Sequence, residues 1–196
     1  MATLFESFYD ILMSPLEKRR FQEIRKQLVG KAKGHVLEIG SGTGMNFPYY
    51  GQAQSVMAVE PSAFLREKSM ERVKASLIPI DVQEGTAEQL PFPSNHFDTV
   101  VVTLVLCSVS NLEQALAEIH RVCKPNGSIL LFEHVRVRNP VLGRLQDWLT
   151  PVWKVMCDGC HLNRDTVRRL RSAGIKVIRF KRWMKGIFIE IEATKK

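Results

Sequence analysis

A short apolar run near the amino-terminal end of the sequence leads into three closely spaced glycines. The run covers residues 36–39, and Gly40, Gly42 and Gly44 follow it at every second position. Glycine has no Cβ, so such a loop can turn tightly and lets a ligand lie against the backbone. A strand that ends in a loop of this kind is typical of ligand sites at the open end of a parallel sheet. The residue types therefore predict a cofactor site.

The spacing of these glycines bears on which cofactor the loop holds. A dinucleotide-binding loop has the spacing Gly-x-Gly-x-x-Gly, whereas this chain has Gly44 and then Met45. Glu38, an acidic residue, also precedes the loop, which suits a diphosphate poorly. A phosphate-free cofactor with a sulfonium and an amino-acid tail fits better. A nucleotide and a simple turn remain alternatives.

Glu60 ends the next apolar run, residues 56–59, and lies 22 positions after Glu38. An acidic residue about 20 positions further along can reach ribose hydroxyls. A carboxylate accepts hydrogen bonds from both hydroxyls at once. The alternative is a surface residue that begins a turn before Pro61. After a third apolar run, the polar segment 83–92 can border the edge of an adenine ring.

Four segments of the chain occur in an order that is specific as a set. They are residues 37–44, 59–62, 85–92 and 121–127. Together they resemble the class I methyltransferases of the ubiquinone and menaquinone biosynthesis type, which use S-adenosylmethionine (SAM). A more specific resemblance, to the methyltransferase-like thiol S-methyltransferases, rests on residues 103–109, 132–135, 153–154 and 158–162.

The resemblance implies a position for each part of SAM. Gly40, Gly42 and Gly44 would lie under the methionine part, and Glu60 would bind the ribose. Leu104 would close over the sulfonium, and S-adenosylhomocysteine would be the product. The implied cofactor site contains these further residues: Glu38, Ser41, Thr43, Asn46, Pro61, Thr86, Ala87, Glu88 and Thr103. Thr86, Ala87 and Glu88 would lie by the adenine, although the family often has an acidic residue where Thr86 stands.

Methyl transfer is an in-line displacement at a carbon that the sulfonium already activates, so alignment of the acceptor can suffice. Four residues are candidates for removing a proton from the acceptor: Tyr9, His134, Asp158 and His161. His134 could instead cap a strand end. His161 belongs to the segment 157–161, which resembles a metal-binding run, but a turn beside the acceptor is favoured and no metal is expected.

The elements that must position these residues alternate between strands and helices. Such alternation predicts a doubly wound α/β fold with a mostly parallel sheet. The expected strands are 36–39, 56–59, 78–82, 99–106 and 128–132, followed by a hairpin of 175–180 and 187–191. The expected helices are 5–29, 62–75, 112–123, 140–156 and 165–173. The resemblance adds a seven-stranded sheet whose last strand is antiparallel.

One domain is expected to contain the whole chain, residues 1–196. Residues 1–30 would form an amino-terminal helical lid, 34–135 the SAM-binding core, and 136–196 the acceptor-side helices and hairpin. Leu145, Trp148, Leu149 and Val152 form an apolar face of the helix 140–156. The aromatic residues could form a lid, and their helical spacing fits core packing equally: Phe5, Phe8, Tyr9, Trp148 and Trp153. Cys107 and Cys123 are expected in the core.

Charge is distributed unevenly along the 196 residues. Residues 136–196 contain 15 Lys/Arg and 5 Asp/Glu, so they account for +10, whereas residues 1–135 account for −2 of the net +8. The basic part could attract an anionic substrate or membrane, or be a solvated helix. Nucleic acid is disfavoured because no recognised binding motif is present.

Localisation and activity follow from the same features. Four cysteines without a signal peptide indicate the cytoplasm, with peripheral contact to an anionic membrane as an alternative. The predicted activity is methylation of a small lipophilic acceptor, with a thiol favoured. Methylation of a phospholipid or quinone at a membrane surface and non-catalytic SAM binding are the alternatives, and the sequence leaves the oligomeric state open.

Overall fold

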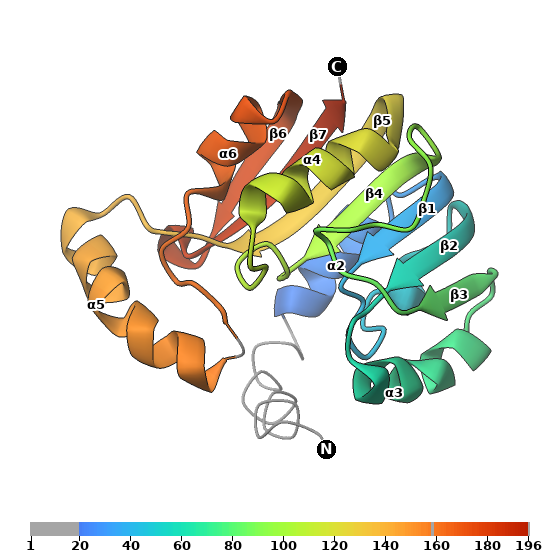
Figure 1. Ribbon diagram of the computed structural model, residues 1–196, viewed down its shortest axis with the longest axis horizontal. Helices are drawn as coiled ribbons and strands as arrows, with labels where there is room; N and C mark the ends of the chain where they lie inside the picture. The colour runs from blue at the N-terminus through green and yellow to red at the C-terminus, as the bar shows by residue number, and fades with distance from the viewer. Residues whose placement is uncertain (1–19, 158, 196) are drawn as a thin grey trace.

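Strands and helices alternate along the computed structural model, which describes residues 20–157 and 159–195 (Figure 1). The described elements are, in order, α2 (Gln22–Val29), β1 (Gly34–Ile39), η2 (Phe47–Tyr49), β2 (Ala53–Val59), α3 (Ala63–Lys74), β3 (Ile80–Gln83), β4 (Phe97–Thr103), α4 (Leu112–Val122), β5 (Cys123–His134), α5 (Pro140–Met156), α6 (Thr166–Ser172), β6 (Ile175–Trp183), η3 (Met184–Gly186) and β7 (Phe188–Lys195). Most of the predicted lid, residues 1–19, lies outside the described residues.

The seven described strands form one sheet in the order β3-β2-β1-β4-β5-β7-β6. The pairs β1–β2, β1–β4, β2–β3 and β4–β5 are parallel. Only β7 runs antiparallel to its neighbours within this sheet, and it pairs with both β5 and β6. The predicted doubly wound, mostly parallel sheet with an antiparallel last strand is therefore confirmed, and so is the carboxy-terminal hairpin.

Both faces of the sheet are covered, because successive side chains of a strand point to opposite faces. Leu37 on β1 packs in the same cluster as Leu116 of α4, and this cluster also holds the buried side of α6. Val36, the preceding residue, packs with Leu28 of α2 on the opposite face. Figure 1 shows α4 and α6 in front of the sheet and α2 behind it.

The fourth strand is shorter than predicted. The apolar run 99–106 predicts one strand, but β4 ends at Thr103 and Leu104 adopts a left-handed backbone conformation with φ 59°. The Leu104 N–H then donates to the Phe132 carbonyl at 2.7 Å. Cys107 is buried in the core as expected, yet it lies in the loop after β4 and not on the strand.

The fifth strand is longer than predicted. The expected turn 125–127 lies inside β5, because the pairing with β4 jumps from Cys123 to Ser128. Asn126, in this irregular stretch, has φ 60°. The turn residues thus produce a bulge within the strand and do not separate it from α4.

Helix α5 has the predicted bounds and lies apart from the other helices, at the left of Figure 1. Its first turn is capped by Asn139, whose Oδ1 accepts from the Val141 and Leu142 N–H groups. The predicted apolar face does not pack in the core: Trp148 is 76% exposed and Val152 is 61% exposed.

The side of α5 that is turned toward the protein is the polar one. Gln146 on that side accepts from the Val137 N–H at 2.8 Å and donates to the Val135 carbonyl at 3.2 Å. Thr150, one turn later, is buried. These contacts hold α5 against the end of β5 and leave its apolar stripe facing outward.

Candidate functional site

The order of the strands reverses between β1 and β4. From β1 the chain continues to β2 on one side, and later returns to β4 on the other. The loops that leave the carboxyl ends of these strands diverge, and ligands of doubly wound sheets bind in the resulting crevice. The glycine loop after β1 and the loop after β4 both lie at this position (Figure 1).

The glycine loop combines tight packing at one residue with open space at another. Gly40 has φ +66°, and a Cβ there would lie 2.4 Å from Val105 Cγ2. Gly42 has φ +54° and no atom within 4 Å of its Cβ position. Ser41 Oγ is buried and has no hydrogen-bond partner among the described residues. The space beside the Gly42 backbone and the unpartnered Ser41 hydroxyl fit a polar ligand such as the amino-acid part of SAM.

Glu60 is held by the loops on both sides of it. Its Oε2 accepts from the Gly42 N–H at 2.9 Å, and its Oε1 accepts from the Ser62 N–H at 3.0 Å. A carboxylate oxygen can accept more than one hydrogen bond, and a ribose hydroxyl is the donor that the predicted role requires. Glu60 is 6% exposed, which fixes its orientation at the end of β2. This arrangement fits the predicted role.

A buried polar network lies behind the glycine loop. Glu38 accepts from Tyr50 Oη at 2.7 Å and from Asn46 Nδ2 at 2.8 Å. Arg25 Nη1 donates to Asn46 Oδ1 at 2.8 Å and to Thr103 Oγ1 at 3.0 Å. Burial raises the pKa of Glu38 to about 7, although these hydrogen bonds oppose the shift. Glu38, Asn46 and Thr103, three predicted cofactor residues, thus hold the loop from behind.

Arg25 and Tyr50 complete this network, and the sequence analysis did not single them out. Arg25 lies within the apolar stripe of the predicted first helix, and it is 5% exposed. An arginine inside an apolar stripe was the available indication of a buried partner. Tyr50 offered none, because its partner is 12 residues away in sequence.

Two further loop residues contribute backbone carbonyls to arginines of α3. The Thr43 carbonyl accepts from Arg72 Nη1 at 2.6 Å, and the Pro61 carbonyl accepts from Arg66 Nη1 at 2.8 Å. Arg66 lies in the first part of α3 and Arg72 in its last turn, so the helix contacts the predicted cofactor loops from both of its ends.

The loop after β3 contains the residues expected near adenine. Thr86 is exposed and pairs with Gln89 in an isolated bridge, while Ala87 is buried. Glu88 Oε1 accepts from the Ser110 and Asn111 N–H groups at 2.8 and 3.3 Å. The Glu88 side chain therefore holds the segment that leads into α4. Of Thr86, Ala87 and Glu88, Thr86 is the exposed residue.

Glu133, which the sequence analysis did not single out, anchors the loop after β4. It is fully buried at the end of β5, and its Oε1 accepts from the Val105 and Leu106 N–H groups, each at 2.9 Å. Burial raises its pKa to about 8 against the effect of these bonds. Oε2 has no partner among the described residues. Leu104 begins the loop that Glu133 holds.

His134 lies next to Glu133 and is neutral near pH 7. Burial lowers its pKa to about 4, and a hydrogen bond to the backbone of His161 opposes this shift. Its ring meets the ring of Phe188 edge-on, with centroids 5.4 Å apart. Nδ1 is buried without a partner in the described part of the chain. Two of the predicted proton acceptors, His134 and His161, are therefore neighbours in the structure. The contact is between the His134 ring and the backbone of His161.

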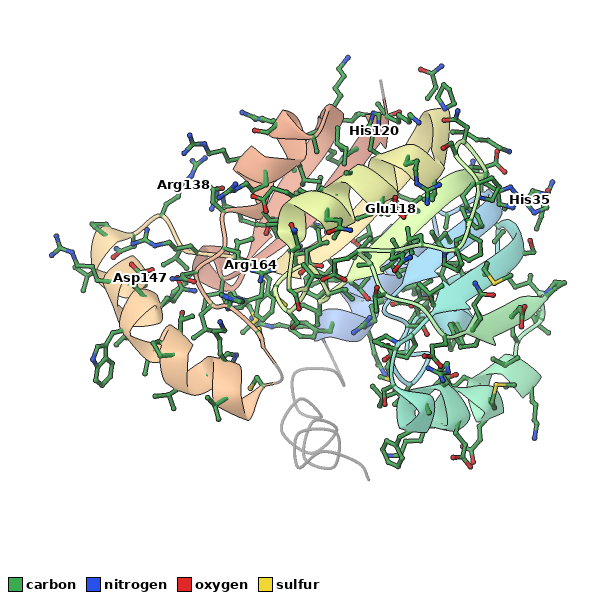
Figure 2. The ribbon with its side chains drawn as sticks, viewed as in Figure 1. His35, Glu118, His120, Arg138, Asp147 and Arg164 are labelled. Atoms are coloured by element: carbon green, nitrogen blue, oxygen red, sulfur yellow. The ribbon has the colours of Figure 1, made fainter. Side chains whose placement is uncertain are left out.

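The segment that contains His161 is hydrogen-bonded to the loop after β4. The His161 N–H donates to the Cys107 carbonyl at 2.8 Å. Arg164 donates to the Leu106 carbonyl, and to the Val109 carbonyl at 2.6 Å. Desolvation lowers the pKa of His161, with further contributions from Arg164 and Lys154. Figure 2 shows Arg164 between α5 and the sheet.

Two of the predicted proton acceptors, Tyr9 and Asp158, lie outside the described residues. Within residues 20–157 and 159–195, no group of three His, Cys, Asp or Glu side chains could hold a metal ion. No helix of this part of the chain is long and apolar enough to cross a bilayer.

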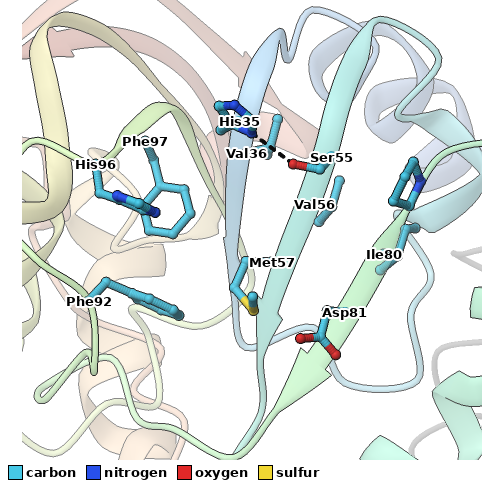
Figure 3. Close-up of a pocket in the computed structure, with 11 residues that line it drawn as sticks. His35, Val36, Ser55, Val56, Met57, Ile80, Asp81, Phe92, His96 and Phe97 are labelled. Carbon is cyan, nitrogen blue, oxygen red and sulfur yellow. Dashed lines mark hydrogen bonds between the residues drawn. The ribbon is translucent and has the colours of Figure 1, made fainter.

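A groove of about 350 Å³ lies over β1, β2 and β3, away from the crevice (Figure 3). Its lining includes His35, which bonds to Ser55 Oγ at 2.9 Å, and Phe97 at the start of β4. Because these residues mark the amino-terminal halves of the strands, the groove is separate from the candidate site.

Comparisons with known proteins agree with this geometry. Residues 37–131 match the family model described as "Methyltransferase domain". A thiol S-methyltransferase, TMT1B of Rattus norvegicus, is 36% identical over 180 residues, which cover 88% of this chain and 72% of that protein. A ubiquinone/menaquinone biosynthesis C-methyltransferase of Azotobacter vinelandii is 29% identical and covers 75% of this chain and 60% of its own length.

Solved structures show the same fold. A SAM-dependent methyltransferase of Thermotoga maritima superimposes with a TM-score of 0.69 at 25% identity, over 98% of both chains. A geranyl diphosphate methyltransferase in complex with SAM gives a TM-score of 0.77 at 13% identity, over 100% of this chain and 93% of that one. With its sheet order, glycine loop and relatives taken together, the chain belongs to the class I SAM-dependent methyltransferases.

Proposed function

We propose that this enzyme transfers the methyl group of SAM to the sulfur of a small lipophilic thiol. The observation that carries the proposal is the 36% identity to a thiol S-methyltransferase over 88% of this chain. The loops after β4 and β5, which border the crevice, fall inside the region of similarity. Leu104 begins the first of these loops, and His134 is the last residue of β5, directly before the second.

The protonation states of the acceptor side support a thiol. SAM, when bound, supplies an activated methyl group, so the protein has to align the acceptor and exclude water. His134 has a pKa of about 4, and the pKa of His161 is also lowered, so neither is a strong base. A thiol ionises near pH 8.5 and is a strong nucleophile as the thiolate, so it needs less help from a base than an alcohol does.

The test is turnover of SAM to S-adenosylhomocysteine with a panel of acceptors. The panel contains an apolar alkyl thiol, a charged thiol of similar size, and the amine and alcohol that match the apolar thiol. We expect kcat/KM to be highest for the apolar thiol. Methylation of the amine or alcohol without methylation of either thiol would overturn the proposal.

We propose as a second candidate that the acceptor is a lipid or quinone reached at an anionic membrane surface. The exposed apolar stripe of α5 favours it: Val141 is 73%, Trp148 76%, Val152 61% and Val155 86% exposed. Arg144 lies on the same helix, in the part of the chain that carries +10. An exposed apolar helix face within a basic segment is typical of interfacial helices.

Sedimentation with vesicles tests this second candidate. The protein should bind vesicles that contain phosphatidylserine more strongly than neutral ones, and Trp148→Glu with Val152→Glu should reduce binding about tenfold or more. Ile178→Glu is the matched control, because Ile178 is 67% exposed on β6, away from α5. Equal binding by the control and the α5 variant would contradict the proposal.

A further inference from the structure

Two cysteines from distant parts of the chain meet between the loop after β4 and the loop after α5. The backbone joins these loops directly, because the residue after Cys160 donates its N–H to the Cys107 carbonyl at 2.8 Å. Arg164 adds two bonds to carbonyls on either side of Cys107. The two cysteines are 53 positions apart in sequence and are brought together by the fold alone.

The side chains of this pair interact with each other. Each thiol shifts the pKa of the other, and Cys107 Sγ also lies 3.7 Å from Ser108 Oγ. Cys107 is 4% exposed, whereas Cys160 is half-buried and remains accessible to a small molecule. All four cysteines are free thiols in the structure.

The environment makes the two sulfurs unequal. Interaction with the Cys107 thiol, the largest cause, lowers the pKa of Cys160 to about 7, and the positive charge of Arg164 contributes. Interaction with Cys160, the largest cause, and burial raise the pKa of Cys107. A half-buried thiolate next to a second, protonated thiol is the arrangement of an oxidisable pair.

We propose that Cys107 and Cys160 form a reversible disulfide when the protein meets a hydroperoxide. The Cys160 thiolate would attack the peroxide, forming an S–O bond and breaking the O–O bond, so that Cys160 becomes a sulfenic acid and hydroxide leaves. The hydroxide becomes water by taking up a proton equivalent to the one that Cys160 released on ionising. The sulfur of Cys107 then attacks that sulfur, the S–S bond forms, and the hydroxyl departs as water with the proton of Cys107. Two thiols and one hydrogen peroxide give one disulfide and two waters.

The disulfide would join two loops that border the acceptor side. One of them begins with Leu104 and is bonded to Glu133. The other contains His161, whose backbone bonds to His134. This modification site is independent of the identity of the methyl acceptor.

Thiol counting and peptide mapping test the proposal. The reduced full-length protein is treated with one equivalent of hydrogen peroxide, and the remaining thiols are trapped with N-ethylmaleimide after denaturation. We expect the number of adducts to fall from four to two, with a peptide pair linked through Cys107 and Cys160 that dithiothreitol separates. Four remaining adducts, or a linked pair that contains Cys123 or Cys157, would overturn the proposal.

Serine variants assign the roles of the two sulfurs. In Cys107→Ser, Cys160 should stop at the sulfenic acid and be trapped by dimedone. In Cys160→Ser, Cys107 should stay unmodified at the same peroxide dose. Cys123→Ser and Cys157→Ser are matched controls that should still form the disulfide. The peptide map of the peroxide-treated wild-type protein tests the Cys107–Cys160 linkage directly, so the proposal remains testable even if Cys107→Ser fails to fold.

Discussion

Three buried or nearly buried glutamates at the ends of strands have different environments in this protein. Glu60 receives two backbone N–H groups from loops at the crevice. Glu38 receives side-chain donors behind the loop, and burial raises its pKa to about 7. Glu133 receives backbone donors from the loop after β4, yet burial raises its pKa to about 8. One residue type thus bonds to loops at the crevice in one place, where we predict ribose binding, and holds loops in two others.

At the residue scale, we expect Glu60→Ala to weaken SAM binding about 10- to 100-fold. Hydrogen bonds to a charged group contribute about 1.5–3 kcal/mol, and the variant also releases the Gly42 N–H. Isothermal titration calorimetry with SAM measures the change. Glu84→Ala is the matched control, because Glu84 is an exposed carboxylate nearby that pairs with Arg66. Unchanged affinity in Glu60→Ala would exclude Glu60 from the cofactor site.

The raised pKa of Glu133 predicts a pH dependence of stability. The ordinary pKa is 4.5 and the folded-state value is about 8, so between these pH values the folded chain keeps a proton that the unfolded chain has released. The contribution of Glu133 to stability is therefore fully present below about pH 4.5 and is lost as the pH rises to about 8. We expect Glu133→Gln to flatten the fall in urea-unfolding free energy over this window by about 1–3 kcal/mol. An unchanged slope in the variant would show that Glu133 titrates normally in the folded state.

At the element scale, α4 and α5 have similar apolar periodicity but different environments. Leu112, Leu116 and Ile119 of α4 are buried against the sheet. The corresponding stripe of α5 is exposed, because Gln146 and Thr150 occupy the side that contacts the end of β5. Periodicity alone therefore predicts that both helices form, but not which side of each one is buried.

We expect Leu116→Ala in α4 to destabilise the fold by about 2–5 kcal/mol. Leu116 is 1% exposed between α4 and the sheet, and its truncation leaves a cavity in the core. Gln114→Ala, an exposed position of the same helix, is the control and should change stability by less than about 0.5 kcal/mol. Urea unfolding compares them, and equal losses would mean that α4 is not packed as described.

At the scale of the whole molecule, the sheet brings segments that are distant in sequence together at the carboxyl ends of its parallel strands. The loops after β1, β2 and β4 meet because parallel strands place their carboxyl ends on the same side. Most of the basic residues of the carboxy-terminal third lie on α5, α6 and β6. The candidate cofactor residues occupy one part of the crevice edge, and the acceptor-side loops and the charged segment adjoin it.

The sequence by itself determined the type and order of the described elements, the glycine loop after β1 and the protein family. Local patterns suffice for these features, because strand and helix periodicity and the glycine spacing are read from neighbouring residues. The bounds of α5 and the presence of the carboxy-terminal antiparallel hairpin are predicted correctly for this reason, although both strands of the hairpin are longer than predicted. The resemblance to methyltransferases rested on the same local motifs.

Tertiary structure alone decided which side chains meet. The roles of Arg25, Tyr50 and Glu133 depend on partners from other elements, so no local pattern identifies those partners. The early end of β4 follows from the left-handed Leu104 and its bond to Phe132 on the neighbouring strand. The contact between Cys107 and Cys160 and the outward apolar face of α5 likewise result from long-range packing, which spacing along the chain does not encode.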